Sequence, residues 1–212
     1  MDDNLILSAL PEDEETAIRS HLTLAALTRD KVLARRGDIL TRVYFPTTAL
    51  ISMRTEVEIG LIGAEGVVGG FCALGRREAP HELRVVSGGS AYSMDCMAFA
   101  MALEELPVLR TRVLEHLHRQ LSELSEAAQI HASGSLAERL AWRLDARFAR
   151  GNGELRITHA ELSSLLGVRR AGITLALHAF EARRAIRSGR GRITLLDRGA
   201  LIGPGAAQAS SR

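Results

Sequence analysis

Residues 155–177 read LRITHAELSSLLGVRRAGITLAL, and this stretch contains the most specific structural signal in the chain. A short strand at its start ends at Thr158, an N-cap residue with Glu161 at the capping-box offset. One helix follows, Gly167 supplies the left-handed residue that a turn between two helices needs, and a second helix begins near Arg169. The stretch predicts a helix-turn-helix, and an ordinary pair of packed helices is the alternative.

The second of these helices has a buried face and a polar face. Its expected buried residues recur at helical spacing, and they are Ile173, Ala176, Leu177 and Phe180. Its N-terminus presents Arg169, Arg170 and Thr174 on the polar side. In a helix-turn-helix the first residues of the second helix reach base edges in the major groove, where an arginine can make two hydrogen bonds to a guanine. The polar side is therefore a candidate DNA-reading surface.

A β-hairpin with an arginine-rich glycine tip is predicted behind this helix, in residues 185–196. Arg190, Gly191 and Arg192 form the tip, and their side chains and backbone N–H groups suit contact with phosphates. The strand before the helix pair and the hairpin after it complete a winged helix-turn-helix. They argue against an ordinary pair of packed helices.

The charge of the 212-residue chain is divided unevenly, although its net value is only +2. Residues 133–212 carry 14 Arg against 6 Asp or Glu, whereas residues 1–132 carry 13 Lys or Arg against 19 Asp or Glu. A basic segment behind an acidic one is expected where a nucleic-acid-binding domain follows a non-binding domain. A chance excess on a solvated surface is the alternative.

The N-terminal half lacks such a motif and is organised differently. Residues 4–27 predict one or two short helices. Short apolar or alternating runs, separated by Gly, Pro and polar turns, then predict strands at residues 38–45, 49–53, 57–62, 83–86 and 91–94. Several short strands at close spacing are typical of a small barrel or roll, and helical periodicity returns at residues 98–105.

The most regular segment of the chain is a predicted helix over residues 107–131. Apolar residues recur along it at spacings of 3, 4, 3 and 4, and they are Leu114, Leu117, Leu121, Leu124 and Ala128. This narrow stripe with polar flanks favours pairing with a second copy of the chain. A helix packed on the core of its own domain is the alternative. The predicted fold class is α+β, with a sensor-like β-roll in residues 1–106, a dimerisation helix in 107–132 and a winged helix-turn-helix in 133–212.

The chain resembles the Crp/Fnr family of transcription regulators over nearly its whole length. The runs GVRRAGIT at 167–174 and RGRITLLDR at 190–198 are typical of one large subgroup, and IGLIGAEGVVG at 59–69 looks like its roll. The resemblance implies a cyclic-nucleotide-binding-type β-roll before the dimerisation helix. It also implies that Thr158 and Arg169 meet phosphates and that Arg170 reads a base. The next position, often Glu in relatives, is Ala171, so the family's commonest half-site is not expected to carry over unchanged.

The effector region departs from relatives that bind cyclic AMP or GMP, which use a Gly-rich turn, a Glu for the ribose and an Arg-Ser pair for the phosphate. By resemblance, Gly70 stands at the Glu position and Pro80-His81-Glu82 stands where the pair would be. The Glu82 carboxylate would repel a phosphate. The expected pocket is therefore a degenerate one, with the residues Gly66, Gly69, Gly70, His81 and Glu82. We expect weak or absent binding of the common cyclic mononucleotides, and the effector stays unidentified or absent.

Other cofactors have less support. Two cysteines cannot supply the thiolates of the iron–sulfur-sensing relatives, and nothing supports haem ligation. His116 and His118 are two apart on a helix and make a poor metal pair, so no metal site is expected. Cys72 and Cys96 are either a redox pair or, as is more usual for isolated cysteines in a β-rich core, small buried hydrophobes.

The sequence contains no nucleophile elbow, P-loop, zinc-ligand spacing or paired carboxylates in a plausible cleft, so we do not expect an enzyme. No apolar run approaches the ~20 residues of a membrane span, and a cytoplasmic location is expected. The favoured function is that of a homodimeric, sequence-specific regulator bound to a pseudo-palindromic site on double-stranded DNA, with RNA polymerase as a further candidate partner. The alternative is a ligand-sensing roll that acts on a protein partner.

Overall fold

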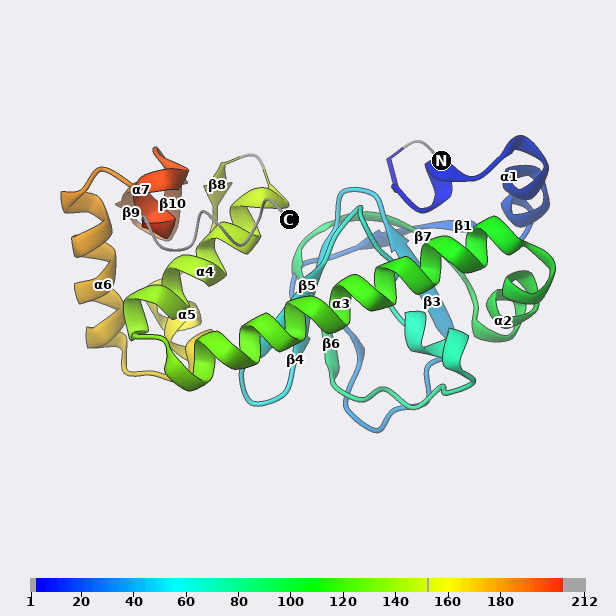
Figure 1. Cartoon of the computed structure of the whole chain (residues 1–212), viewed down its shortest axis with the longest axis horizontal. Coiled ribbons are helices and arrows are strands. Elements are labelled where there is room, and N and C mark those ends of the chain that lie inside the picture. Colours follow the sequence, from blue (N-terminus) through cyan, green and yellow to red (C-terminus); the bar gives the residue numbers. More distant parts are fainter. Residues whose placement is uncertain (1–2, 152, 204–212) are drawn as a thin grey trace. The chain divides into compact units, whose positions relative to one another are not determined.

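The computed structural model describes residues 3–151 and 153–203 and divides the chain into two compact units (Figure 1). The first unit extends to Ser125 and the second begins at Glu126. The division falls inside the long helix α3 (Pro107–Ser133). Within the described ranges, no helix is long and apolar enough to cross a membrane.

The first unit begins with the 3-10 helix η1 (Leu7–Ala9) and the helix α1 (Glu12–Arg19). The prediction of helix as far as residue 27 is wrong, because Thr23–Leu27 form the strand β1. This strand pairs antiparallel with β7 (Gly89–Asp95) along its whole length. A segment as short as Thr-Leu-Ala-Ala-Leu has little conformational preference of its own, so its distant strand partner decides its structure.

The predicted roll is present and consists of two antiparallel sheets. One has the strand order β1-β7-β3 and the other the order β2-β6-β4-β5. The remaining bounds are β2 (Val32–Ala34), β3 (Arg42–Pro46), β4 (Leu50–Arg54), β5 (Glu58–Ile62) and β6 (Glu82–Ser87). Their inward side chains form one apolar core, in which the rings of Phe45 and Phe99 meet edge to face with centroids 6.0 Å apart.

Helices close the roll. The 3-10 helix η2 (Gly70–Leu74) and the helix α2 (Cys96–Glu105) contact each other, and both lie on the core. The α3 helix follows, and its buried residues Leu109 and Val113 belong to the same core. The helix starts at Pro107, as the sequence predicts.

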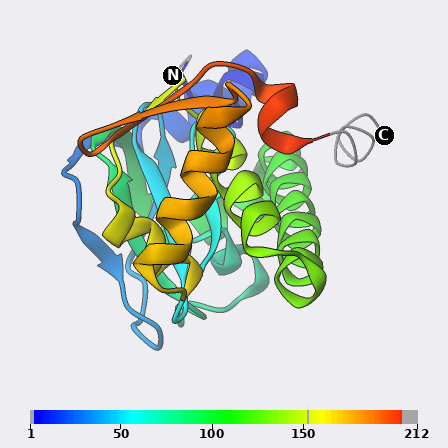
Figure 2. The same cartoon turned by 90° about the vertical axis from the view of Figure 1, so that its left-hand side faces the viewer.

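The second unit is a small α+β domain. Its elements are α4 (Leu136–Ala149), β8 (Glu154–Leu155), α5 (His159–Leu166), α6 (Arg170–Ala182), β9 (Ile186–Gly189), β10 (Arg192–Leu195) and α7 (Arg198–Ile202). Its strands form an antiparallel sheet in the order β8-β10-β9. Figure 2 shows α6 in gold with the orange β9–β10 hairpin, which we call the wing, extending from its C-terminal end. The predicted fold class, a β-roll, a long helix and a winged helix-turn-helix, is confirmed.

Candidate nucleic-acid interface

The start of α5 has the local structure that the sequence predicts. The Thr158 hydroxyl accepts a hydrogen bond from the Glu161 backbone N–H at 3.2 Å, and the Glu161 carboxylate accepts one from the Thr158 N–H at 2.7 Å. This reciprocal pair is the capping box. At the other end of α5, Gly167 has φ of 63°, so its lack of a Cβ allows the sharp turn into α6. Together these two ends fix where α6 begins.

Two arginines stand at the N-terminus of α6. Arg169 is the N-cap residue and Arg170 the first helical residue, and both are exposed. Neither makes an ion pair with any residue that the structure describes. A helix N-terminus carries partial positive charge and N–H groups without intrahelical partners. This end of α6 therefore combines two cationic side chains with a helix end that attracts anions.

Thr174 lies one turn further along α6 and is half-buried. Its hydroxyl donates to the Arg170 carbonyl at 3.2 Å, and its oxygen lies 3.0 Å from Nδ1 of His159 at the start of α5. The hydroxyl therefore already has partners within the domain. Thr174 joins the two helices and stands at the edge of the surface that Arg170 occupies.

The wing turns at Arg190 and Gly191, and Gly191 has φ of 70°. Its carbonyl accepts a hydrogen bond from the Ile157 N–H at 3.0 Å. A Cβ placed on Gly191 would lie 4.0 Å from the methyl group of Thr158. The wing tip is therefore held beside the N-terminus of α5.

The two tip arginines differ in their surroundings. Arg190 is exposed and makes no ion pair within the described part of the chain. Arg192 is also exposed, but its Nη1 lies 3.3 Å from Oε2 of Glu154 on the neighbouring strand β8. An exposed ion pair of this kind is worth little, so the guanidinium of Arg192 can exchange it for another anion.

These contacts bring the predicted DNA-binding residues together. Thr158 lies beside the wing tip, whose Gly191 carbonyl is bonded to the neighbouring Ile157, and His159 reaches Thr174 on α6. The sequence analysis missed Leu175, whose side chain is 74% exposed next to Thr174. The sequence could have indicated this exposure, because position 175 does not fall on the helical spacing of the buried residues of α6. The candidate surface thus includes an exposed apolar side chain beside Thr174.

The predicted dimerisation residues of α3 separate into two groups. Leu114 and Leu121 are 47% and 63% exposed, and Ala128 is exposed on the same seven-residue spacing. We call these three residues the α3 stripe. Leu117, by contrast, packs against the core of the roll, and Leu124 is half-buried. One side of the helix packs on its own domain, whereas the α3 stripe is exposed in the single chain. Pairing of this stripe with a second copy stays a prediction.

The glycines of the expected effector pocket lie against side chains of the roll and of α3. A Cβ on Gly66 would come within 2.2 Å of the His116 ring, and one on Gly70 within 3.2 Å of Leu117. Gly69, with φ of 86°, is the N-cap of η2 and lies against Leu40 and Val43.

His81 and Glu82 stand at the start of β6, at the other end of the expected pocket. Glu82 Oε1 accepts a hydrogen bond from Nε of Arg84 at 2.8 Å, and this bond holds the pKa of the Glu82 carboxyl below its usual value. Burial lowers the pKa of His81. A neutral imidazole and a carboxylate with its own arginine do not make a phosphate site.

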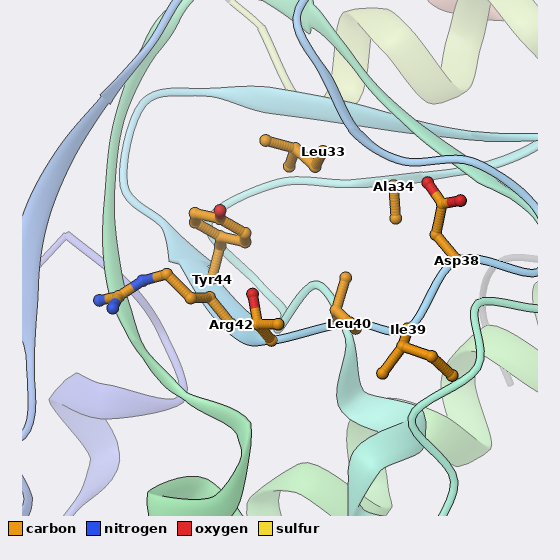
Figure 3. A pocket seen from close by; sticks show the side chains of 8 residues that line it. Leu33, Ala34, Asp38, Ile39, Leu40, Arg42 and Tyr44 are labelled. Carbon is orange, nitrogen blue, oxygen red and sulfur yellow. The ribbon is translucent and has the colours of Figure 1, made fainter.

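A cavity of about 330 Å³ lies elsewhere in the roll (Figure 3). None of the five expected pocket residues lines it, and its lining consists of Leu33, Ala34, Asp38, Ile39, Leu40, Thr41, Arg42 and Tyr44. The Arg42 side chain extends away from the other lining residues and donates hydrogen bonds to the carbonyl and hydroxyl of Ser93. In the described part of the chain, no three His, Cys, Asp or Glu side chains are grouped to hold a metal ion.

Comparison with known proteins gives one family-model match, to the Crp-like helix-turn-helix domain, over residues 136–203. Among solved structures, the c-di-GMP responsive global regulator CLP of Xanthomonas campestris is 15% identical with a TM-score of 0.72, over 87% of this chain and 99% of that chain. FixK2 from Bradyrhizobium japonicum is 14% identical with a TM-score of 0.72, over 85% and 95%. The CRP/FNR-family regulator TTHA1359 from Thermus thermophilus is 20% identical with a TM-score of 0.66, over 84% and 96%. No curated protein sequence matches the chain.

Proposed function

We propose that this protein, which has the fold of the Crp/Fnr transcription regulators and a Crp-like helix-turn-helix domain, is a homodimeric, sequence-specific DNA-binding regulator. One observation carries the proposal. Arg169 and Arg170 stand exposed at the N-terminus of α6, without an ion pair among the described residues. Two unneutralised guanidinium groups at a helix end that attracts anions are suited to a polyanion.

The N-terminus of α6 enters the major groove in this proposal. Arg170 donates two hydrogen bonds to O6 and N7 of a guanine, and Arg169 contacts a phosphate. The Thr158 hydroxyl uses its oxygen to cap α5, and its proton is available to a phosphate oxygen. Thr174 lies on the same face and supports the placement of α6 through His159.

The wing adds backbone contacts. Arg190 and Arg192 at its tip meet phosphates next to those that Thr158 contacts, because the tip lies against Thr158. Phosphate contacts set the register of the protein on the duplex and do not read its sequence. Specificity in this proposal therefore comes from α6.

The α3 stripe supports the dimer. Leu114, Leu121 and Ala128 recur every seven residues on an exposed face, which is the pattern that a second helix of the same kind covers. A two-fold dimer carries two α6 helices and reads two half-sites about one helical turn apart, so the operator is pseudo-palindromic. Such a regulator acts on chromosomal DNA in the cytoplasm, with RNA polymerase as a candidate further partner.

The test is selection of bound duplexes from a random-sequence DNA pool by the full-length protein, at moderate salt and without added ligand. We expect enrichment of a two-fold symmetric motif. Arg170→Ala is expected to cost about 1–3 kcal/mol and to relax the preference at one position of each half-site. Arg36→Ala, which removes an exposed arginine of the roll, is the matched control and leaves the motif unchanged.

Only salt-sensitive, sequence-independent binding by the wild-type protein would contradict specific recognition by the ligand-free form. If Arg170→Ala weakened binding to all DNA sequences equally, the proposal that Arg170 contacts a base would be wrong.

A further inference from the structure

The two cysteines of the chain, 24 positions apart in sequence, meet inside the roll. The Sγ atoms of Cys72 and Cys96 are 3.3 Å apart, and both residues are buried. A disulfide requires about 2.0 Å between the sulfurs, so closure needs a movement of little more than 1 Å. The thiols are therefore placed to react with each other.

The segment that carries Cys72 is short and lies between two glycines. Cys72 lies in the 3-10 helix η2, which is bounded by Gly69 and Gly75, both in the left-handed conformation. Next to Gly75, Leu74 is 64% exposed, so the end of η2 lies at the surface. Cys96 is the first residue of α2, and its N–H is bonded to the Thr41 carbonyl at 2.9 Å. One thiol is thus on a helix whose first N–H is bonded to Thr41, and the other is on a short 3-10 segment between two glycines.

The two thiols differ in acidity. The hydrogen bond with Cys96 lowers the pKa of the Cys72 thiol, and this effect outweighs burial, which raises the pKa. The positive charge of Arg77 also lowers the pKa of Cys72. The same hydrogen bond raises the pKa of Cys96, and burial adds to this effect. Cys72 is therefore the sulfur that becomes a thiolate, which is the reactive form, and Cys96 keeps its proton.

We propose that Cys72 and Cys96 are a modification site, at which a hydroperoxide oxidises the two thiols to an intramolecular disulfide. The Cys72 thiolate attacks hydrogen peroxide, so that an S–O bond forms, the O–O bond breaks and hydroxide leaves. The Cys96 sulfur then attacks the sulfenic acid, the S–S bond forms, and the S–O oxygen leaves as water. The hydroxide takes up the proton that Cys72 released, and the Cys96 proton leaves with the S–O oxygen. The sulfurs lose two electrons, one peroxide becomes two water molecules, and a dithiol reductant restores both thiols.

The site is connected to α3 through η2. A Cβ on Gly70, at the start of η2, would lie 3.2 Å from Leu117, so the segment that moves on oxidation packs against α3. Because packed elements shift together, oxidation is expected to change the helix that carries the α3 stripe. This consequence rests on the proposed dimer, whereas the disulfide itself does not.

The experiment treats the reduced, full-length protein with stoichiometric hydrogen peroxide and counts its thiols after denaturation. The expected result is a loss of both thiols, a mass lower by two hydrogen atoms, and full recovery with dithiothreitol. In C96A a dimedone adduct should form on Cys72, and C72A should lose its remaining thiol more slowly than the wild type. Thermal unfolding first shows that both variants fold.

Two retained thiols, addition of oxygen without loss of hydrogen, or a bond between two chains would each overturn the site. The effect of oxidation on the dimer is measured separately, by sedimentation of the reduced and oxidised protein. We expect a shift in the dimer dissociation constant for the wild type that peroxide does not produce in C72A. An unchanged constant in a protein that has formed the disulfide would overturn the coupling, and a protein that is monomeric in both states would overturn the proposed dimer.

Discussion

The imidazole of His159 lies 3.0 Å from the hydroxyl of Thr174, and this contact joins the first helix of the helix-turn-helix to the second. The core beneath the two helices is apolar, with Leu162 and Ile173 fully buried. The contact between His159 and Thr174 lies outside this apolar core and is partly exposed. Because the Thr174 hydroxyl also donates to the Arg170 carbonyl, the contact ties the start of α5 to the first turn of α6.

This contact predicts coupling between the two residues. Thr174→Val and His159→Phe should each lower the free energy of unfolding by about 1 kcal/mol, and the double variant by less than their sum. Chemical denaturation of the four proteins measures the coupling energy. Thr174→Ser, which keeps the hydroxyl, is the control and should retain it. If the free-energy changes of the two single variants add up to that of the double variant, the contact contributes nothing to stability.

Removal of Arg190 should weaken DNA binding without changing its specificity. The wing tip meets phosphates in the proposed complex, so Arg190→Ala should reduce the slope of log affinity against log salt by about 1 for each protomer. Fluorescence anisotropy with the selected duplex and a scrambled duplex at several salt concentrations checks this. Arg36→Ala should leave the slope unchanged. A loss confined to the selected duplex would show instead that Arg190 reads a base.

Truncation of Leu121 should dissociate the dimer and leave the subunit folded. The side chain is 63% exposed in the single chain, and burial of a leucine is worth about 1.5–3 kcal/mol. Because Leu121→Ala removes one leucine from each protomer, the dimer should lose twice that amount. Sedimentation equilibrium measures the loss. Leu24→Ala, at a leucine 64% exposed on β1, is the control, and an equal effect there would reject the α3 stripe as the interface.

The acid dependence of stability should include a contribution from His81. Burial lowers the pKa of His81 below its usual value of about 6.5, so the unfolded chain binds the proton more readily than the folded one. The free energy of unfolding should therefore fall as the pH drops through about 6.5, and His81→Gln should remove this part of the fall. Urea unfolding across this range checks the difference. His21→Gln changes an exposed histidine and should retain the wild-type dependence.

Cyclic AMP and cyclic GMP should not bind with micromolar or tighter affinity. The Glu82 carboxylate is bonded to Arg84, and the turn glycines Gly66 and Gly70 lie against His116 and Leu117. A phosphate would meet a negative charge at one end of the expected pocket. Calorimetric titration of the full-length protein tests this expectation, and a micromolar dissociation constant for either nucleotide would refute it.

The helix-turn-helix could be predicted in detail because its features are local. The capping box at Thr158 depends on a residue three positions away, and the turn at Gly167 depends on the left-handed conformation of that one residue. The strand β1 shows the limit of such reasoning. Its residues carry no local strand signal, and their pairing with β7, more than sixty positions later, overrides the expected helix.

The helix-turn-helix and the long helix from Pro107 could be predicted from the sequence because their patterns are local. The roll was indicated by the spacing of its short strands, although its strand pairings join residues far apart in the chain. Only the tertiary structure decided which leucines of α3 face outward and that Cys72 lies against Cys96. It also decided that the Glu14 carboxylate of α1 accepts hydrogen bonds from the N–H groups of Val108 and Leu109 at the start of α3. The physical reason is that these partners are brought together only when the core packs, and packing depends on the whole chain at once.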